Sequence, residues 1–294
     1  MVKVPFAWFG GKSLLVPWIL PILRQYPHKK YIEPFGGSGA ILLAKEPRFD
    51  VYNDLNENVV NFYRVLKNPK TFEELVRLIA LSPCSRKAFN DAIKEFKTGK
   101  DAIKKAANFY IIARQSFSGK GGMSPSSATW GTMHDTKMDG IKEGHRVAHV
   151  VARWLNSIDR LPAIHNRLKK VQIEHLDAID IMKKYACTKT LFYLDPPYVA
   201  DTRKGGKYQH ECDDDFHRNL VDTMLSVPGH KVLSGYESEL YQPLLDAGYT
   251  LKKRESVCLV YKNAGTKKRT FDKDEMIRTE CLYCSPLPKD QLLF

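Results

Sequence analysis

One short segment, Asp195-Pro196-Pro197-Tyr198, combines residue types suited to binding a group that carries N–H donors. The two prolines lack backbone N–H groups, so the segment offers a carboxylate and backbone carbonyls, which only accept hydrogen bonds. Tyr198 adds a flat aromatic face on which a planar base could stack. The set fits the amino group of a nucleobase, and a rigid turn without a ligand is the alternative interpretation.

A second segment, the glycine-rich residues 33–40, lies between a predicted strand and a predicted helix. Glycines there let a ligand approach the backbone and leave the amides of a helix N-terminus available. Asp54 follows the next predicted strand, 18 positions after Gly36, where an acidic residue binds ribose hydroxyls in dinucleotide-binding folds. These features predict a nucleoside-containing cofactor, with a plain tight turn as the alternative. NAD fits poorly because, counted from Gly37, the third glycine position of G-x-G-x-x-G holds Leu42.

The elements that must position these segments read as α/β. The apolar run Leu191–Leu194 ends at Asp195, as expected of a buried parallel strand whose carboxyl end faces a ligand. Further short strands are predicted over 31–33, 51–53, 171–174, 231–233, 249–260 and 278–283. Between them, helices are predicted over 14–25, 57–66, 178–185 and 213–225. The loop Gly235–Ser238 follows one of these strands and could line the same pocket.

The middle of the chain has a different character. Helical spacing extends over 72–80, 86–96 and 102–117, with Ser85 as a candidate cap, and a further helix is predicted over 146–160. The turn-forming residues 118–127 interrupt these helices as a long loop. The predicted architecture is a Rossmann-like doubly wound α/β sheet domain, residues 1–62 and 163–294, with a mostly helical insertion at 63–162.

The composition narrows the classes of partner that the protein is expected to bind. Lys and Arg number 46 against 33 Asp and Glu, a formal charge of +13, which favours a polyanion: nucleic acid first and an acidic membrane surface second. A soluble protein with a basic surface and no polyanionic partner is the alternative interpretation. No apolar run approaches the ~20 residues of a membrane helix, and no signal peptide is apparent, so a cytoplasmic protein is predicted. Six cysteines are too few for a disulfide scaffold, and Cys281-x-x-Cys284 is half a zinc site, so no metal is predicted.

Four motifs in order give the chain a family resemblance: Phe6-Ala7-Trp8-Phe9-Gly10-Gly11-Lys12, Pro34-Phe35-Gly36-Gly37-Ser38-Gly39-Ala40, Asn53-Asp54-Leu55-Asn56 and Asp195-Pro196-Pro197-Tyr198. Together they resemble the Dam-like family of DNA adenine-N6 methyltransferases, which use S-adenosylmethionine. The resemblance implies methyl transfer to the N6 amino group of adenine in double-stranded DNA, by base flipping and direct transfer. It makes residues 1–62 and 163–294 the catalytic, cofactor-binding domain and residues 63–162 the target-recognition domain.

The resemblance also implies roles for individual residues. Asp195, Pro196, Pro197 and Tyr198 would form the catalytic pocket. The residues implied to bind S-adenosylmethionine are Trp8, Gly11, Lys12, Glu33, Pro34, Phe35, Gly36, Gly37, Ser38, Gly39, Asp54 and Asp177. Among these, Lys12 could pair with the cofactor's carboxylate, Asp54 would accept from the ribose hydroxyls, and Asp177 would contact the cofactor's adenine, with Asp180 as a nearby competitor.

DNA contacts are predicted from cations among turn-forming residues. These candidates are Arg114, Ser118, Lys120, Arg203 and Lys204, with solvated surface loops as the alternative. The expected partner is double-stranded DNA without membrane or metal. The protein is expected to be a monomer, and a cognate restriction endonuclease would act separately.

Three rival functions remain open. Cytosine-N4 or RNA adenine methylation would use the same chemistry, but an Asp at the head of the Asp-Pro-Pro-Tyr motif favours adenine by family resemblance. A non-catalytic DNA-binding protein on this fold is opposed by the presence of Lys12, Asp54 and Asp195 together. An NAD oxidoreductase is opposed by Leu42.

Overall fold

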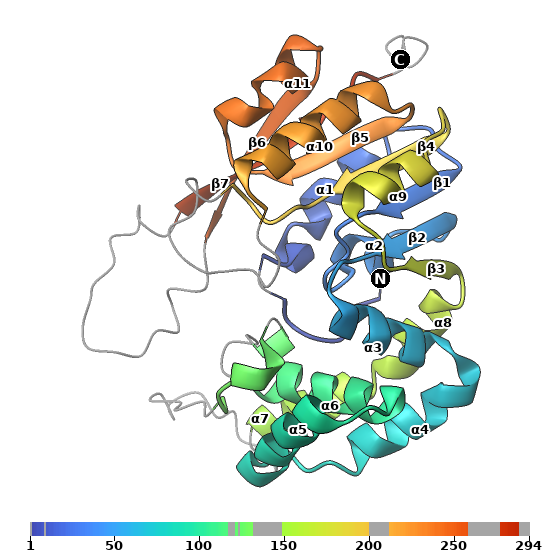
Figure 1. The fold of residues 1–294 in the computed structure, drawn as a ribbon, viewed down its shortest axis with the longest axis vertical. Helices are drawn as coiled ribbons and strands as arrows, with labels where there is room; N and C mark the ends of the chain where they lie inside the picture. Colours follow the sequence, from blue (N-terminus) through green and yellow to red (C-terminus); the bar gives the residue numbers. More distant parts are fainter. Residues whose placement is uncertain are drawn as a thin grey trace, which may run out of the picture. The chain divides into compact units, whose positions relative to one another are not determined.

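The computed structural model describes residues 2–8, 10–116, 121–122, 124–131, 149–199, 212–257 and 277–287. Strands run over β1 (Lys30–Glu33), β2 (Phe49–Asn53), β3 (Val171–Glu174), β4 (Thr190–Leu194), β5 (His230–Gly235), β6 (Thr250–Val257) and β7 (Ile277–Cys284). Helices run over α1 (Val16–Leu23), α2 (Ala40–Ala44), α3 (Glu57–Lys67), α4 (Pro69–Ala80), α5 (Arg86–Thr98), α6 (Ala102–Gln115), α7 (His149–Ile158), α8 (Leu161–Leu168), α9 (Ala178–Lys184), α10 (Asp214–Ser226) and α11 (Gln242–Asp246) (Figure 1).

Within the described residues, the strands form one seven-stranded sheet in the order β3-β2-β1-β4-β5-β7-β6. Strand β1 pairs in parallel with both β2 and β4, β4 pairs in parallel with β5, and β7 runs antiparallel between β5 and β6. The chain therefore moves outward from β1 to β2 and β3, then crosses back to β4, so the strand order reverses between β1 and β4. Open α/β sheets bind ligands beyond the carboxyl ends of the strands at such a switch point. The predicted doubly wound α/β class is confirmed.

Local sequence explains where several elements begin. Asn56 accepts hydrogen bonds from backbone amides in the first turn of α3, and the candidate cap Ser85 accepts one in α5. Helix α1 differs, because Leu15 precedes it and a cap at Ser13 is not formed. Helix α1 begins at Val16 instead of Leu14, with Pro17 in its first turn, where proline is tolerated, and it continues past Pro21 to Leu23. All five residues of β4 are buried, as expected of a central strand covered on both faces.

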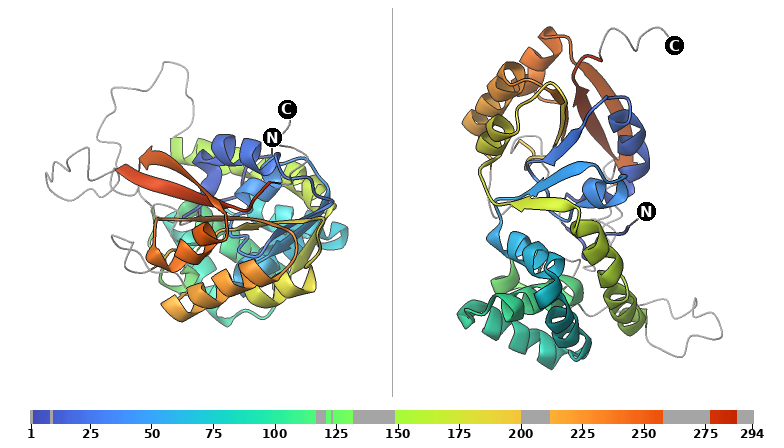
Figure 2. Two further views of the ribbon diagram at one scale, coloured as in Figure 1. Left: turned by 90° about the horizontal axis from the view of Figure 1, so that it is seen from above. Right: turned by 90° about the vertical axis from the view of Figure 1, so that its right-hand side faces the viewer.

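The described chain divides into two compact units. One consists of residues 14–36, 46–55 and 174–294, and contains most of the sheet. Figure 2 shows α9 and α10 on one face of this sheet and α1 on the other. The apolar core between the sheet and α9 and α10 includes Ile32, Phe192 and Leu194 from the strands and Met182 and Met224 from the helices.

The second unit consists of residues 1–13, 37–45 and 56–173 and is mainly helical. Helix α6 is its centre, since most of its residues are buried and α3, α4 and α5 all contact it. An aromatic cluster anchors the N-terminal segment here: the Phe6 ring lies 5.4 Å from that of Phe62 and 5.3 Å from that of Phe109. The predicted insertion, residues 63–162, falls inside this unit, and its role in reading DNA stays a prediction.

Membrane insertion finds no support in the helices: over the described residues, none is both long and apolar enough to span a bilayer.

Candidate functional site

Strand β4 delivers the Asp195-Pro196-Pro197-Tyr198 turn to the carboxyl edge of the sheet. Asp195 is half-buried, whereas Pro196 and Tyr198 are buried. The Tyr198 hydroxyl donates a hydrogen bond to Oε2 of Glu280 at 2.7 Å and lies 3.2 Å from Oγ of Ser234. The Tyr198 ring also packs edge-on against Tyr236, with 4.6 Å between ring centroids. The turn is therefore held at its far end as well as by the strand.

Burial and nearby carboxylates control the ionisation of two tyrosines at this edge. Burial raises the pKa of Tyr198 well above its ordinary value, and the charges of Asp195 and Glu280 raise it further. Burial likewise raises the pKa of Tyr193, again with help from Asp195. Both phenols remain protonated over the physiological pH range, so Tyr198 acts as a hydrogen-bond donor and not as a base.

The first part of the glycine-rich segment follows β1, the neighbour of β4. The Gly36 amide donates to the Asn53 carbonyl at 2.7 Å, which joins the ends of β1 and β2. A Cβ at Gly36 would lie 2.2 Å from the ring of Tyr52, so only glycine fits this position without displacement of that ring.

Asn53 ties three strand ends together. Its buried side-chain amide donates to the carbonyls of Pro34 and Leu176, both at 2.9 Å, and its Oδ1 accepts from the Leu176 amide at 2.9 Å. Pro34 follows β1 and Leu176 follows β3, with Asn53 itself ending β2. The loops after these strands are thereby fixed relative to one another.

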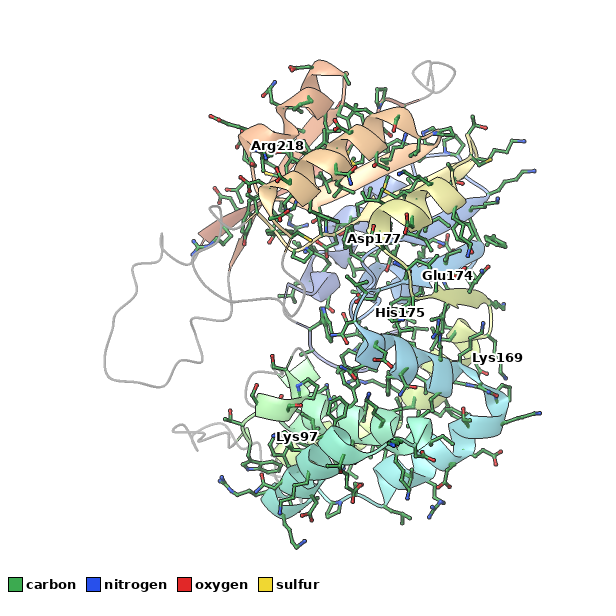
Figure 3. The ribbon with its side chains drawn as sticks, viewed as in Figure 1. Lys97, Lys169, Glu174, His175, Asp177 and Arg218 are labelled. Carbon is green, nitrogen blue, oxygen red and sulfur yellow. The ribbon has the colours of Figure 1, made fainter. Side chains whose placement is uncertain are left out.

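Two aspartates follow the ends of β2 and β3. Asp54 is half-buried directly after β2. Asp177 caps α9, where its Oδ1 accepts from the Ile179 amide at 2.8 Å. Figure 3 shows Asp177 where the chain passes from β3 into α9, near Glu174 and His175. In sheet order, Asp177, Asp54, Gly36 and Asp195 thus follow four neighbouring strands, β3, β2, β1 and β4.

The remaining part of the glycine-rich segment belongs to the helical unit. Gly37 has φ +49°, and a Cβ there would lie 2.8 Å from Nε1 of Trp8. Gly39 has φ +66° and precedes α2, and the Ser38 carbonyl accepts from the Tyr63 hydroxyl at 2.6 Å. The left-handed conformation of both glycines disfavours other residues.

Within the helical unit, Trp8, Gly11 and Lys12 form one turn. The Gly11 amide donates to the Trp8 carbonyl at 3.0 Å. Lys12 is buried, with its Nζ donating to the Gly10 carbonyl at 2.9 Å. The structure thus places the Lys12 ammonium beside the Gly10 carbonyl, in the segment predicted to bind an anionic group.

The residues after β1, β2 and β3 fit a nucleoside-containing cofactor. At Gly36 the Tyr52 ring fills the space that a Cβ would take, so the loop after β1 carries no side chain at this position. Asp54 adds a half-buried carboxylate that can accept hydrogen bonds from hydroxyl groups. Phe35 packs edge-on against Phe216 of α10, with 6.1 Å between ring centroids. This contact holds the loop after β1 against α10.

Of the predicted DNA contacts, the structure describes Arg114 alone. It lies in the last turn of α6, half-buried, and one of its terminal nitrogens donates to the Arg153 carbonyl at 3.1 Å. Burial lowers the pKa of Arg114, and the positive charges of Arg153 and Arg160 lower it further. Ser118, Lys120, Arg203 and Lys204 lie outside the described residues. The described part of the chain contains no cluster of metal-binding side chains, and Cys281 and Cys284 are buried in β7.

The sequence does not reveal the roles of three residues at the carboxyl edge of the sheet. Glu280 and Ser234 were not identified, because Glu280 lies 82 residues from Tyr198 and reaches it through an antiparallel strand. Asn53 belongs to the Asn53-Asp54-Leu55-Asn56 motif, but the motif itself gives no sign of the bridging role of this side chain. Its position as the buried last residue of a strand was the available signal. The loop expected to line the pocket does supply Tyr236, which contacts Tyr198.

Comparison with known proteins gives consistent matches. Residues 8–258 match the family model described as D12 class N6 adenine-specific DNA methyltransferase. The Type II methyltransferase M.MjaIII of Methanocaldococcus jannaschii is 25% identical over 280 residues, 86% of this chain and 90% of that protein. The Type II methyltransferase M1.LlaDCHI of Lactococcus lactis is 26% identical over 221 residues, 70% of each chain. A DNA adenine methylase of Vibrio cholerae is 30% identical over 115 residues, 38% of this chain and 40% of that protein.

Proposed function

Because the chain belongs to the D12 class N6 adenine-specific DNA methyltransferase family, we propose that its Asp195-Pro196-Pro197-Tyr198 turn binds the amino group of the target adenine. The enzyme methylates the N6 position of adenine in DNA and uses S-adenosylmethionine as its methyl donor. The observation that carries the proposal is the placement of this turn after β4, directly beside the loop that follows β1, where the strand order reverses.

The chemical problem is the poor nucleophilicity of the amino nitrogen, whose lone pair is delocalised into the adenine ring. Extrusion of the base from the duplex costs a few kcal/mol and removes the pairing and stacking that shield this nitrogen. The carboxylate of Asp195 and the carbonyl of Pro196 would then accept its two N–H bonds. These acceptors stabilise the positive charge that develops on the nitrogen, which lowers the barrier.

S-adenosylmethionine would supply, when bound, a methyl group whose bond to sulfur breaks as the amino nitrogen bonds to it in one in-line displacement, with S-adenosylhomocysteine as the leaving group. The methylated nitrogen then loses one of its protons to solvent, which gives the neutral N6-methyl amine. The residues of this chain contribute orientation, acceptance of the N–H bonds and exclusion of water. No covalent bond between enzyme and substrate is required.

We assign cofactor binding to the residues that the resemblance implies. Asp54 would accept from the ribose hydroxyls and Asp177 would contact the adenine of the cofactor. Lys12 would pair with its carboxylate. The other assigned residues are Trp8, Gly11, Glu33, Pro34, Phe35, Gly36, Gly37, Ser38 and Gly39.

We assign target recognition to residues 63–162, including Arg114. Among the described residues, helices α4 to α7 lie wholly within this segment, and the whole chain carries a net charge of +13; both support a separate DNA-reading unit. A monomer that acts separately from a restriction endonuclease is part of the same proposal.

Asp195→Asn tests the catalytic assignment, because the amide offers one acceptor and brings two unwanted donors. We expect the single-turnover rate of methyl transfer to unmethylated genomic DNA to fall about 10²–10³-fold. The affinity for S-adenosylmethionine, measured by calorimetry, should change less than about threefold, since the adenine amino group is not part of that interaction.

Asp222→Asn is the matched control, because Asp222 is an exposed aspartate on α10. This variant should transfer methyl groups at the wild-type rate. Wild-type activity in Asp195→Asn would refute the assignment.

A further inference from the structure

Tyr198 is anchored from two strands that lie far from it in sequence. Ser234 is on β5 and Glu280 is on β7, and both contact the Tyr198 hydroxyl. The two strands are antiparallel neighbours, with Ser234 paired to Leu282 in their register. The hydroxyl therefore binds to the sheet at the boundary between its parallel and antiparallel parts.

The direction of the hydrogen bonds follows from the number of protons. The Tyr198 hydroxyl has a single proton, and this proton is donated to Oε2 of Glu280. The Ser234 hydroxyl must then donate to the Tyr198 oxygen for the 3.2 Å contact to be a hydrogen bond. The result is an ordered chain from Ser234 through Tyr198 to Glu280, and the Tyr198 hydroxyl has no proton left for a substrate.

This anchoring determines where Asp195 lies. On one side Leu194 is fixed in the sheet opposite Leu233 of β5. On the other side Tyr198 is fixed by Glu280, Ser234 and Tyr236. The residues between Asp195 and Tyr198 are two prolines, whose φ angles are restricted. A displacement of Tyr198 is therefore transmitted to Asp195 and is not absorbed by a flexible linker.

We propose that Glu280 is a positioning residue of the reaction: by accepting the hydrogen bond of Tyr198, it fixes the turn that presents Asp195 and the Pro196 carbonyl to the target amino group. The proposal rests on the proposed function of Asp195. It assigns the hydroxyl of Tyr198 to anchoring and leaves its ring to contact the base. Misplacement of a catalytic group by about 1 Å can cost 10²-fold in rate, so a lost anchor should affect the chemical step more than binding.

The test is a double-mutant cycle of Tyr198→Phe and Glu280→Ala, measured by single-turnover methyl transfer to unmethylated genomic DNA. Each single variant should lower the rate about 10- to 100-fold, with the calorimetric affinity for S-adenosylmethionine within twofold of wild type. The double variant should be no slower than the slower single variant, because both changes break the same hydrogen bond. If the two effects instead multiply in the double variant, Glu280 does not act through Tyr198 and the proposal is wrong.

Two further variants separate positioning from folding. Glu280→Gln keeps an acceptor oxygen and should remain within about threefold of the wild-type rate. Glu255→Ala removes an exposed acid on the neighbouring strand β6 and should have no effect. Thermal unfolding of every variant identifies any that fails to fold. If Glu280→Ala fails to fold, the methyl-transfer rates of Tyr198→Phe and Glu280→Gln are compared instead. A wild-type rate in Tyr198→Phe overturns the proposal. A rate in Glu280→Gln as low as that in Tyr198→Phe overturns it as well.

The outcomes also separate this inference from the proposed function. Retained activity in Asp195→Asn would refute the proposed function of the turn itself. An inactive Asp195→Asn together with wild-type rates in Tyr198→Phe and Glu280→Ala would refute the positioning role alone.

Discussion

At the residue scale, some positions of the site admit only the residue that they hold. Gly36 is the sharpest case, because a Cβ there would lie 2.2 Å from Tyr52. Its amide also binds the Asn53 carbonyl, so the loop cannot move away without loss of that hydrogen bond. The sequence predicts a close approach to the backbone at Gly36, but it does not reveal that the Tyr52 ring fills the space beside this glycine.

Gly36→Ala should lower the free energy of unfolding by about 1–3 kcal/mol, the usual cost of overpacking. It should also weaken S-adenosylmethionine binding at least about tenfold, because the loop must shift. Chemical denaturation and calorimetry measure the two effects.

Addition of Tyr52→Leu provides the control, since the shorter side chain makes room for the new methyl group. This second change should restore part of the lost cofactor affinity. Wild-type affinity in Gly36→Ala alone would show that the loop is not the cofactor's support.

At the element scale, periodicity and caps predicted much of the fold. The buried apolar run of β4 and the caps of α3 and α5 are encoded within a few neighbouring residues, so sequence reasoning found them. The helix predicted over 146–160 stops short of α8, which has Pro162 in its first turn, where proline is tolerated. The contact of β7 with Tyr198 was missed because strand pairing over 82 residues leaves no local pattern.

Asn53 joins the loops after three strands, so its replacement tests how strongly these strand ends depend on one another. Asn53→Ala leaves the carbonyls of Pro34 and Leu176 and the Leu176 amide without their partner. Each unsatisfied group costs about 1–3 kcal/mol when buried, and partial access to water reduces the sum. We expect a loss of about 2–4 kcal/mol in the free energy of unfolding and weaker binding of S-adenosylmethionine.

Asn166→Ala is the control for Asn53, because Asn166 is exposed on α8. Its effect on stability should stay within about 0.5 kcal/mol. A loss in Asn53→Ala no larger than this value would contradict the bridging role.

At the scale of the whole molecule, the excess positive charge and the local cofactor site predict different responses to salt. The net charge of +13 implies that DNA binding releases counterions from many phosphates. Cofactor binding depends on hydrogen bonds and packing at a few residues, for which screening matters less.

DNA affinity should therefore fall by about 10²-fold or more between 50 and 200 mM salt, whereas the affinity for S-adenosylmethionine should change less than about threefold. Fluorescence anisotropy with labelled DNA and calorimetry with the cofactor provide the two measurements at matched salt. DNA binding that does not respond to salt would contradict the electrostatic interpretation of the charge.

The most direct test of the central claim is identification of the product. Wild-type protein and Asp195→Ala are each incubated with S-adenosylmethionine labelled in its methyl group and with unmethylated genomic DNA, and the nucleosides are analysed by mass spectrometry. The account predicts labelled N6-methyladenine with the wild type and none above background with Asp195→Ala. Labelled N4-methylcytosine, no labelled nucleoside from the folded wild type, or equal N6-methyladenine from both proteins would contradict it.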